Sequence, residues 1–399
     1  MSGTFGGALE RRLLSIVGGT IRVGRLTVTL PDGSTRAFRG RFEGPEAHVD
    51  LHDWRLLRRL TTTGAIGLAD GYVAREYDSP DLPAFLELAA WHLEPAYRHE
   101  VPPWLHSLGR TAWRVLAMSS RPRGPLNDIV QHYDLGNDFY ALWLDETMTY
   151  SSAVFADEGM TLADAQREKY RRLAAATGIG PGDHVLEIGS GWGGFATLLA
   201  EEIGCRVTTI TISKAQHDHV AKLIAERGLA DRVEARLQDF RETPGSFDSI
   251  VSVEMMESIP PSLWRPYFDR LRALTKPGGT IGLQLIQVAE HHWAISDSNL
   301  DFVRRYIFPG GQVPSERTLR TLAGDHGLRW RANELYGQDY ARTLRTWLTD
   351  FDAAWPEIAE LGDGFDDRFR RMWRYYLAYC GAGFAVGRVD VGQIVLERP

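Results

Sequence analysis

The pattern of apolar positions divides the 399-residue chain into two regions. In the first region, two runs that alternate apolar and polar residues flank the sequence Pro31-Asp32-Gly33, which is typical of a β-hairpin turn. A further strand is predicted from Ala47, and helices are predicted over residues 53–61 and 81–93. We therefore expect a smaller α+β domain over residues 1–115, with a role in lipid contact or dimerisation.

Beyond residue 125 the pattern changes to helix-length stretches that alternate with short β-rich runs. A helix is predicted over residues 162–177, and the runs that follow are VLEIG, VTTITI, VEARLQ, SIVSVE and TIGLQLIQ. This alternation indicates βαβ units and a doubly wound sheet. A helix over 365–379 and a last strand, VGQIVLE, complete the region. We assign residues 127–399 to one α/β domain, joined to the first domain by a basic linker over residues 116–126.

Composition and charge narrow the class of protein. A formal net charge of −7 argues against a general polycationic surface for nucleic acid, and two cysteines are too few for a disulfide framework or a zinc knuckle. No eighteen apolar residues run together, and Arg11 and Arg12 interrupt the apolar N-terminal stretch. We therefore expect neither a transmembrane helix nor a signal peptide, and a soluble, cytoplasmic protein without a metal site.

Two arginine-rich segments are candidates for contact with a membrane surface. Residues 101–127 contain no acidic residue, and they interleave tryptophans with four arginines: Arg110, Arg114, Arg121 and Arg123. The segment is either an interdomain linker or a basic amphipathic stretch that rests on anionic lipid. The predicted helix around Arg370 presents a second group of arginines, although a solvated helix face is the more frequent meaning of such a pattern.

The strongest local motif is a glycine-rich turn between a predicted strand and a predicted helix. The strand HVLEI ends in Gly189-Ser-Gly191-Trp-Gly-Gly, a sequence that lets a ligand approach the backbone closely. A nicotinamide dinucleotide site requires an acidic ribose-binding residue about twenty positions further on, and RVTTITISKAQ offers none. Glu187 fits the E/D-x-G-x-G pattern of S-adenosylmethionine enzymes, so we favour S-adenosylmethionine as the cofactor.

Six motifs in fixed order extend this interpretation to most of the chain. They are HYDLGNDFYALWLDETMTYSSAVF (residues 132–155), IGSGWGG, TISKAQ, LQDFR, FDSIVSVEMMESI and RRYIFPGGQVPS. Together they resemble the cyclopropane fatty acid synthases and mycolic acid methyltransferases, and residues 1–115 resemble the N-terminal domain of the phospholipid-acting members. The resemblance implies a class I (Rossmann-like) S-adenosylmethionine-dependent methyltransferase that methylates an alkene in a phospholipid acyl chain. It also implies a peripheral membrane enzyme and a possible homodimer.

The same resemblance implies a set of cofactor-binding positions. They include the acidic residue and glycines of the loop, two residues that touch the methionyl part, and residues near the ribose and the adenine. These positions are Tyr150, Ser151, Glu187, Gly189, Gly191, Thr211, Ile212, Gln216, Gln238 and Asp239.

The catalytic positions depart from the family pattern. The resemblance implies a bound bicarbonate as the base, held by Cys, Glu, His, a backbone amide and Tyr. Here Glu257, Tyr340 and the Ile286 backbone match, but Ser152 replaces the Cys and Gln284 replaces the His. Two carboxylates, Glu146 and Glu254, stand where the family pattern has Pro and Gly. Bicarbonate binding is therefore doubtful, and we hypothesise that Glu146, or as second choice Glu254, accepts the proton instead; otherwise Glu146 is an ordinary solvated loop residue.

The product depends on when that proton is lost. Immediate loss from the new methyl group closes a cyclopropane ring, whereas a preceding hydride shift gives an exocyclic methylene. The altered site resembles that of actinobacterial synthases that make 10-methylene chains on the way to tuberculostearic acid, where a separate reductase saturates the product. Three alternatives stay open: a bicarbonate-dependent cyclopropane synthase, a small-molecule O- or N-methyltransferase, and a lipid-binding protein that has lost activity.

Overall fold

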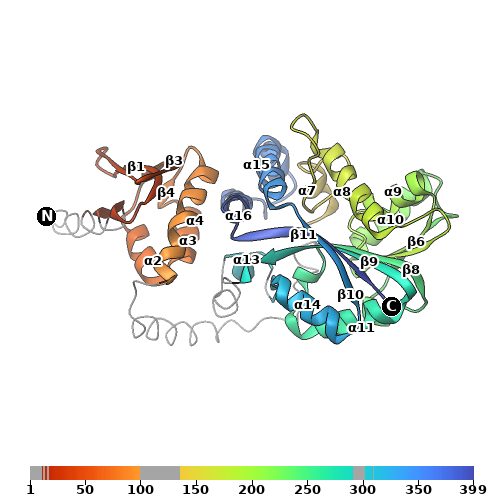
Figure 1. The fold of residues 1–399 in the computed structure, drawn as a ribbon. Helices are drawn as coiled ribbons and strands as arrows, with labels where there is room; N and C mark the ends of the chain where they lie inside the picture. The colour runs from red at the N-terminus through yellow and green to blue at the C-terminus, as the bar shows by residue number, and fades with distance from the viewer. Residues whose placement is uncertain (1–10, 12–13, 16–17, 99–134, 291–301, 309) are drawn as a thin grey trace. The chain divides into compact units, whose positions relative to one another are not determined.

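The computed structural model describes residues 11, 14–15, 18–98, 135–290, 302–308 and 310–399 (Figure 1). The predicted basic segment over residues 101–127, with its linker, lies outside the described residues. Two compact units are present: the first contains the described residues among 1–122, 301–303 and 359–386, and the second contains the rest. This division differs from the predicted boundary, because the helix expected over 365–379 groups with the N-terminal unit.

The first unit contains a four-stranded sheet of order β2-β1-β3-β4. Its strands β1 and β2 pair antiparallel, and the Gly33 N–H donates to the Leu30 carbonyl in the turn between them, which confirms the predicted hairpin. The strands are β1 (Val23–Thr29), β2 (Thr35–Arg39), β3 (Phe42–Leu51) and β4 (Tyr77–Asp78); the helices are α2 (Arg55–Thr63), α3 (Ala65–Val73), α4 (Leu82–Arg98) and α16 (Asp367–Ala385).

Helix α3 forms from the glycine-punctuated sequence AIGLADGYV, for which the sequence predicts no helix. Its glycines are sites of close approach rather than turns. A Cβ at Gly67 would lie 2.5 Å from the Arg59 carbonyl oxygen, and one at Gly71 would lie 2.6 Å from Leu56 Cδ1. Because any side chain at these positions would collide with α2, glycine is what allows the two helices to pack.

Helix α16 is held to the first unit by a buried arginine. The Arg371 guanidinium donates to the carbonyl oxygens of Tyr72 (2.6 Å) and Tyr77 (3.0 Å) and forms an ion pair with Asp78. Arg374 donates to the Tyr72 hydroxyl. The prediction that the arginines of this helix form a membrane-docking face is therefore wrong for Arg371, whose charge is used inside the unit.

The second unit is built on a seven-stranded sheet of order β10-β11-β9-β8-β5-β6-β7 (Figure 1). Neighbouring strands from β9 to β7 run parallel, while β11 and β10 pair antiparallel at the other edge. This arrangement confirms the predicted α/β class I architecture. The strands are β5 (His184–Ile188), β6 (Arg206–Thr211), β7 (Val233–Leu237), β8 (Phe247–Val253), β9 (Thr275–Val288), β10 (Arg329–Leu335) and β11 (Val389–Glu397).

Helices cover both faces of this sheet because successive strand residues point to opposite sides. Val185 packs with residues of α8, α9 and α10, while Leu186 packs with residues of α11 and α14. No described helix is long and apolar enough to cross a membrane. The helices are α7 (Asn137–Ala141), α8 (Leu162–Thr177), α9 (Gly194–Leu198) with a π-helical turn (Leu199–Ile203), α10 (Lys214–Glu226), α11 (Trp264–Leu274), α13 (Phe302–Tyr306), α14 (Glu316–Asp325) and α15 (Gly337–Ala359).

Candidate active site

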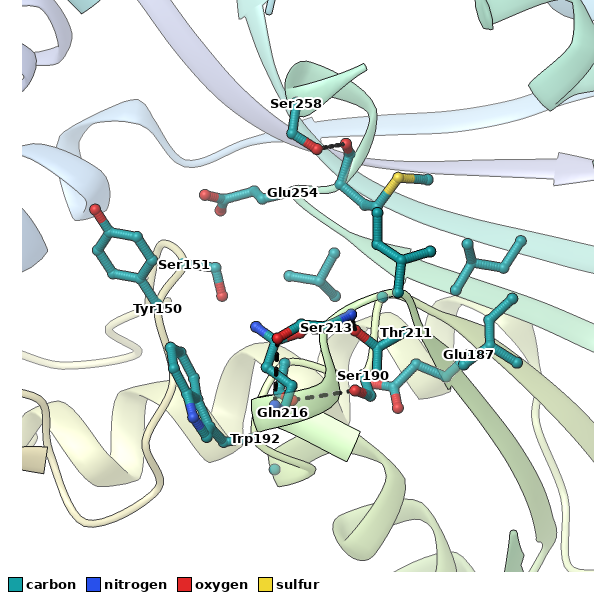
Figure 2. Close-up of a pocket in the computed structure, with 18 of the residues that line it drawn as sticks. Tyr150, Ser151, Glu187, Ser190, Trp192, Thr211, Ser213, Gln216, Glu254 and Ser258 are labelled. Atoms are coloured by element: carbon teal, nitrogen blue, oxygen red, sulfur yellow. Dashed lines mark hydrogen bonds between the residues drawn. The ribbon is translucent and has the colours of Figure 1, made fainter. Parts of the chain in front are cut away.

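A pocket opens at the carboxyl ends of β5, β6 and β8, where ligands bind in doubly wound sheets (Figure 2). Every cofactor-binding position implied by the sequence resemblance lines this one pocket. Figure 2 shows Tyr150 and Ser151 at one side of it, and Glu187 and Thr211 at the strand ends. The lining residues in common with the predicted set are Tyr150, Ser151, Glu187, Gly189, Gly191, Thr211, Ile212, Gln216, Gln238 and Asp239.

The glycine loop presents bare backbone to the pocket. Gly189 and Gly191 both have positive φ (93° and 48°), a conformation that favours glycine. A Cβ at Gly191 would meet no protein atom within 4 Å, so the space beside this backbone belongs to the pocket. The loop is fixed from behind, because the Gly189 and Ser190 N–H groups donate to the Ile210 carbonyl.

The strand ends supply a buried acid and a neutral polar edge. Glu187 is buried, burial raises its pKa to about 8, and one of its oxygens accepts a hydrogen bond from the Thr209 hydroxyl. At the end of β6 the Thr211 hydroxyl donates to the Gln216 side-chain oxygen, and the Ser213 side chain caps α10. The β6 end therefore offers amide and hydroxyl groups, not a carboxylate, to a bound ribose.

A second carboxylate, Glu254, enters the pocket directly after β8. One oxygen accepts hydrogen bonds from the Ser152 N–H (2.8 Å) and the Gln284 side-chain amide (2.9 Å), and the other accepts one from the Tyr340 hydroxyl (2.7 Å). The backbone of Glu254 has φ 49°, in the left-handed region that non-glycine residues seldom adopt. Burial raises its pKa, and the positive charge of Lys169 is the largest effect in the opposite direction.

Glu257 lies close to this network. One oxygen accepts a hydrogen bond from the Ile286 N–H (2.5 Å), which is the backbone contact that the sequence pattern predicts. The other oxygen is buried and has no hydrogen-bond partner among the described residues. Burial, reinforced by the nearby charge of Glu254, raises the pKa of Glu257 to about 8. The sequence-predicted residues Ser152, Gln284, Tyr340 and Glu257 are thus gathered at one place.

Glu146 lies elsewhere. Its side chain is 69% exposed and forms an ion pair with Arg167 (2.5 Å) beside a different depression of the surface, whereas Glu254 lines the pocket of the cofactor-binding positions. The preference for Glu146 over Glu254 as the proton acceptor is therefore wrong in geometric terms, because a solvated, paired carboxylate is held outside that pocket.

Sequence reasoning missed two groups beside the pocket. The Lys169 ammonium of α8 is fully buried and donates to the Ser151 hydroxyl. Met148 lines the pocket with φ 52°, a second non-glycine residue in the left-handed region. A signal for Lys169 was present, since Gln166, Lys169 and Leu173 share the buried face of α8 at helical spacing.

These features fit an adenosyl cofactor. The glycine loop with bare backbone, the buried acid two residues before it and the neutral β6 edge are the parts that such a ligand requires. Together with the strand order, they define an S-adenosylmethionine-dependent methyltransferase of class I. The chain belongs to the mycolic acid cyclopropane synthetase family, whose model matches residues 121–394.

Known proteins of this family match over most of the chain. Tuberculostearic acid methyltransferase UfaA1 of Mycobacterium tuberculosis is 38% identical over 86% of this chain and 81% of its own length. Cyclopropane-fatty-acyl-phospholipid synthase of Escherichia coli K12 is 33% identical over 88% of each chain. The crystal structure of mycolic acid cyclopropane synthase CmaA1 complexed with SAH and CTAB superposes with a TM-score of 0.64 at 27% identity, covering 70% of this chain and 99% of that one.

Proposed function

We propose that this enzyme methylates the double bond of an unsaturated, oleoyl-type phospholipid acyl chain and releases a 10-methylene acyl chain. The observation that carries the proposal is the Glu254 carboxylate, which accepts hydrogen bonds from Ser152, Gln284 and Tyr340 beside the cofactor pocket. The family membership supports the acyl substrate, since relatives are named for fatty acyl phospholipid and tuberculostearic acid chemistry. S-adenosylmethionine, when bound, supplies the electrophilic methyl group.

The residues around the pocket suit a reaction in which positive charge develops on the acyl chain. The π electrons of the double bond form the new carbon–carbon bond, which leaves a carbocation on the chain. Tyr150 lines the pocket, its ring packs against Trp347 (5.2 Å between centroids), and Tyr340 packs against the same indole (6.2 Å). Aromatic faces at this position stabilise a cation by cation–π attraction and exclude water.

Glu254 is then placed to accept the proton that completes the reaction. A hydride shift from the methylated carbon, followed by proton loss from the new methyl group, gives the exocyclic methylene and returns the electron pair of the broken C–H bond to the chain. A general base must reach that proton and be charged beforehand. The three hydrogen bonds to Glu254 favour its carboxylate form, which opposes the effect of burial.

Bicarbonate does not fit beside this carboxylate. The positions that the family resemblance assigns to bicarbonate binding at Ser152, Gln284 and Tyr340 are hydrogen-bonded to Glu254. A second anion there would be repelled by Glu254 and by any charge on Glu257. We therefore propose that a side chain of the protein does the work that the family assigns to a bound anion.

The surroundings of the reaction follow from its chemistry. An acyl chain in a phospholipid is reached from the membrane surface, so we propose peripheral association with the inner face of the plasma membrane. The methylene product is an alkene that a separate reductase could saturate, and a homodimer would present two units to one membrane. These are proposals that follow from the substrate.

Product identification tests the proposal. The purified full-length enzyme is incubated with dioleoyl phosphatidylglycerol vesicles and methyl-labelled S-adenosylmethionine, and the released fatty acids are analysed by mass spectrometry and NMR. We expect a labelled exocyclic methylene at carbon 10. A labelled cyclopropane ring would overturn the product and keep the acyl substrate. Unmodified lipid together with label on the heteroatom of a small molecule would overturn the whole proposal.

A further inference from the structure

The ammonium of Lys169 is buried in the second unit without a carboxylate in direct contact. Its side chain has no exposed surface, and in the described part of the chain its hydrogen-bond partners are two neutral oxygens, the Ser151 hydroxyl and the Gln166 amide, both at 2.6 Å. The Tyr170 ring lies 4.5 Å away. Because an isolated buried charge is costly, such a lysine is retained only where its charge is needed or its loss is compensated.

Two hydrogen-bonded paths connect Lys169 with Glu254. In the first, Lys169 donates to the Ser151 hydroxyl, and the N–H of the next residue, Ser152, donates to the Glu254 carboxylate. In the second, the Gln393 amide donates both to the Lys169 carbonyl and to Gln284, whose own amide donates to the same Glu254 oxygen. The lysine therefore fixes both donors that hold that oxygen.

We propose that Lys169 is a positioning residue of the proposed reaction: its buried ammonium holds the Ser151–Ser152 segment and keeps the Glu254 carboxylate anionic until it accepts the substrate proton. This inference rests on the proposed role of Glu254 as the base.

The charges that face this pair agree with that assignment. Glu254 is faced by Lys169 and Tyr170 from α8, by Tyr340 from α15 and by Glu257 from the turn after β8, while Asp145 acts on Lys169 from the segment before the pocket. Lys169 is the cation among them. Burial lowers the pKa of Lys169 to about 7, and the negative charge of Glu254 is the largest opposing effect.

The sign of the expected pH effect follows directly. Lys169 lowers the pKa of Glu254, so its removal raises that pKa, and the active carboxylate form is reached only at higher pH. In Lys169→Met we expect the rising limb of the pH–turnover profile to move by about one pH unit or more, with turnover below that limb reduced about tenfold per unit. Lys169→Arg keeps the charge and is expected to keep the profile.

The test measures kcat on dioleoyl phosphatidylglycerol vesicles between about pH 6 and pH 9, with SAH affinity by calorimetry and thermal unfolding as independent readouts. Thr177→Val is the matched control: it removes a buried hydroxyl of the same helix that bonds only to α8 carbonyls, so it perturbs packing without changing charge. If Lys169→Met does not fold, the uncharged Lys169→Gln takes its place.

Three outcomes separate the possibilities. An alkaline shift in Lys169→Met, absent in Lys169→Arg and Thr177→Val, supports the proposal. An unshifted profile in folded Lys169→Met, with Glu254→Gln inactive, overturns the role of Lys169 and leaves Glu254 as the base. Full activity of Glu254→Gln overturns the proposed base itself, whatever the lysine variants do.

Discussion

At the residue scale, Glu254 combines a strained backbone with a fully hydrogen-bonded carboxylate. A non-glycine residue in the left-handed region costs about 1–2 kcal/mol, and such strain is concentrated at functional sites. Both of its oxygens are held by groups from separate parts of the chain: Ser152, Gln284 of β9 and Tyr340 of α15. A side chain placed at this cost, beside the cofactor pocket, is what a fixed base requires.

Glu254→Gln and Glu146→Gln form a matched pair that tests this reading. Both substitutions remove a charge and keep the shape of the side chain. We expect Glu254→Gln to lower kcat by about 10²–10⁴-fold, the usual contribution of a general base, with SAH affinity maintained. Glu146→Gln should stay near wild-type activity because its carboxylate is exposed and paired with Arg167. Comparable losses in the two variants would contradict the assignment.

Glu257 should make the stability of the protein depend on pH. Its pKa of about 8 lies above the model value of 4.5, so the folded state holds a proton that the unfolded state releases. The stability from this group is complete below about 4.5 and is lost as the pH rises through about 8. Urea unfolding at pH 6 and pH 9 should therefore show a smaller alkaline loss in Glu257→Gln than in wild type; equal losses would be inconsistent with the raised pKa.

The sequence placed the candidate carboxylates but not their surroundings. Glu146 and Glu254 are equally unusual as letters in the family pattern, yet the direction of the Glu146 side chain depends on Arg167, twenty-one residues later. Lys169 escaped attention because a lysine on an amphipathic helix is normally solvated. Its spacing with Gln166 and Leu173 was the available signal, and only the three-dimensional path to Glu254 gives that spacing a meaning.

At the scale of the elements, the turn between β5 and α9 shows how a local motif predicts a site. The glycines of this loop, the β6 end and the segment before α8 converge on one pocket, as the sequence pattern implies. This part could be predicted because strand, turn and helix adjoin in sequence, so spacing alone fixes their geometry. The Glu254 network could not, since its donors come from elements that only the folded sheet brings together.

Gly191→Ala should separate the cofactor role of that loop from its backbone role. Gly191 (φ 48°) and Gly228 (φ 65°) both have positive φ, and a Cβ at either position would meet no protein atom within 4 Å. Alanine at each should therefore reduce stability similarly, by about 1 kcal/mol. Only Gly191→Ala places a methyl group in the pocket, so SAH affinity should fall about tenfold or more there and stay unchanged in Gly228→Ala. Calorimetry and thermal unfolding give both values.

At the scale of the whole molecule, the first unit takes its last helix from the far end of the chain. Arg371 of α16 donates to the carbonyl oxygens of Tyr72 and Tyr77, about 300 residues away in sequence. The sequence predicted a helix here but assigned it to the catalytic domain, because helical periodicity shows that a face is apolar and not which partner covers it. Domain membership was therefore the part of the fold least accessible to pattern.

Arg371→Met should destabilise this unit. The substitution leaves the two carbonyl oxygens without their donor and Asp78 without its ion pair, at a cost of about 3 kcal/mol. Arg368→Met, on the exposed side of the same helix, should change stability by less than about 0.5 kcal/mol. Thermal or urea unfolding of the full chain compares them; equal stability of the two variants would argue against a structural use of the Arg371 charge.

The most direct test of the central claim is the bicarbonate dependence of wild-type turnover. The enzyme is assayed on dioleoyl phosphatidylglycerol vesicles in buffer stripped of carbon dioxide, and again with added bicarbonate. If the Glu254 carboxylate accepts the proton, the two rates are equal and the product is the 10-methylene chain in both. A rate that collapses without bicarbonate and recovers when it is returned would show that a bound anion, not this side chain, is the base.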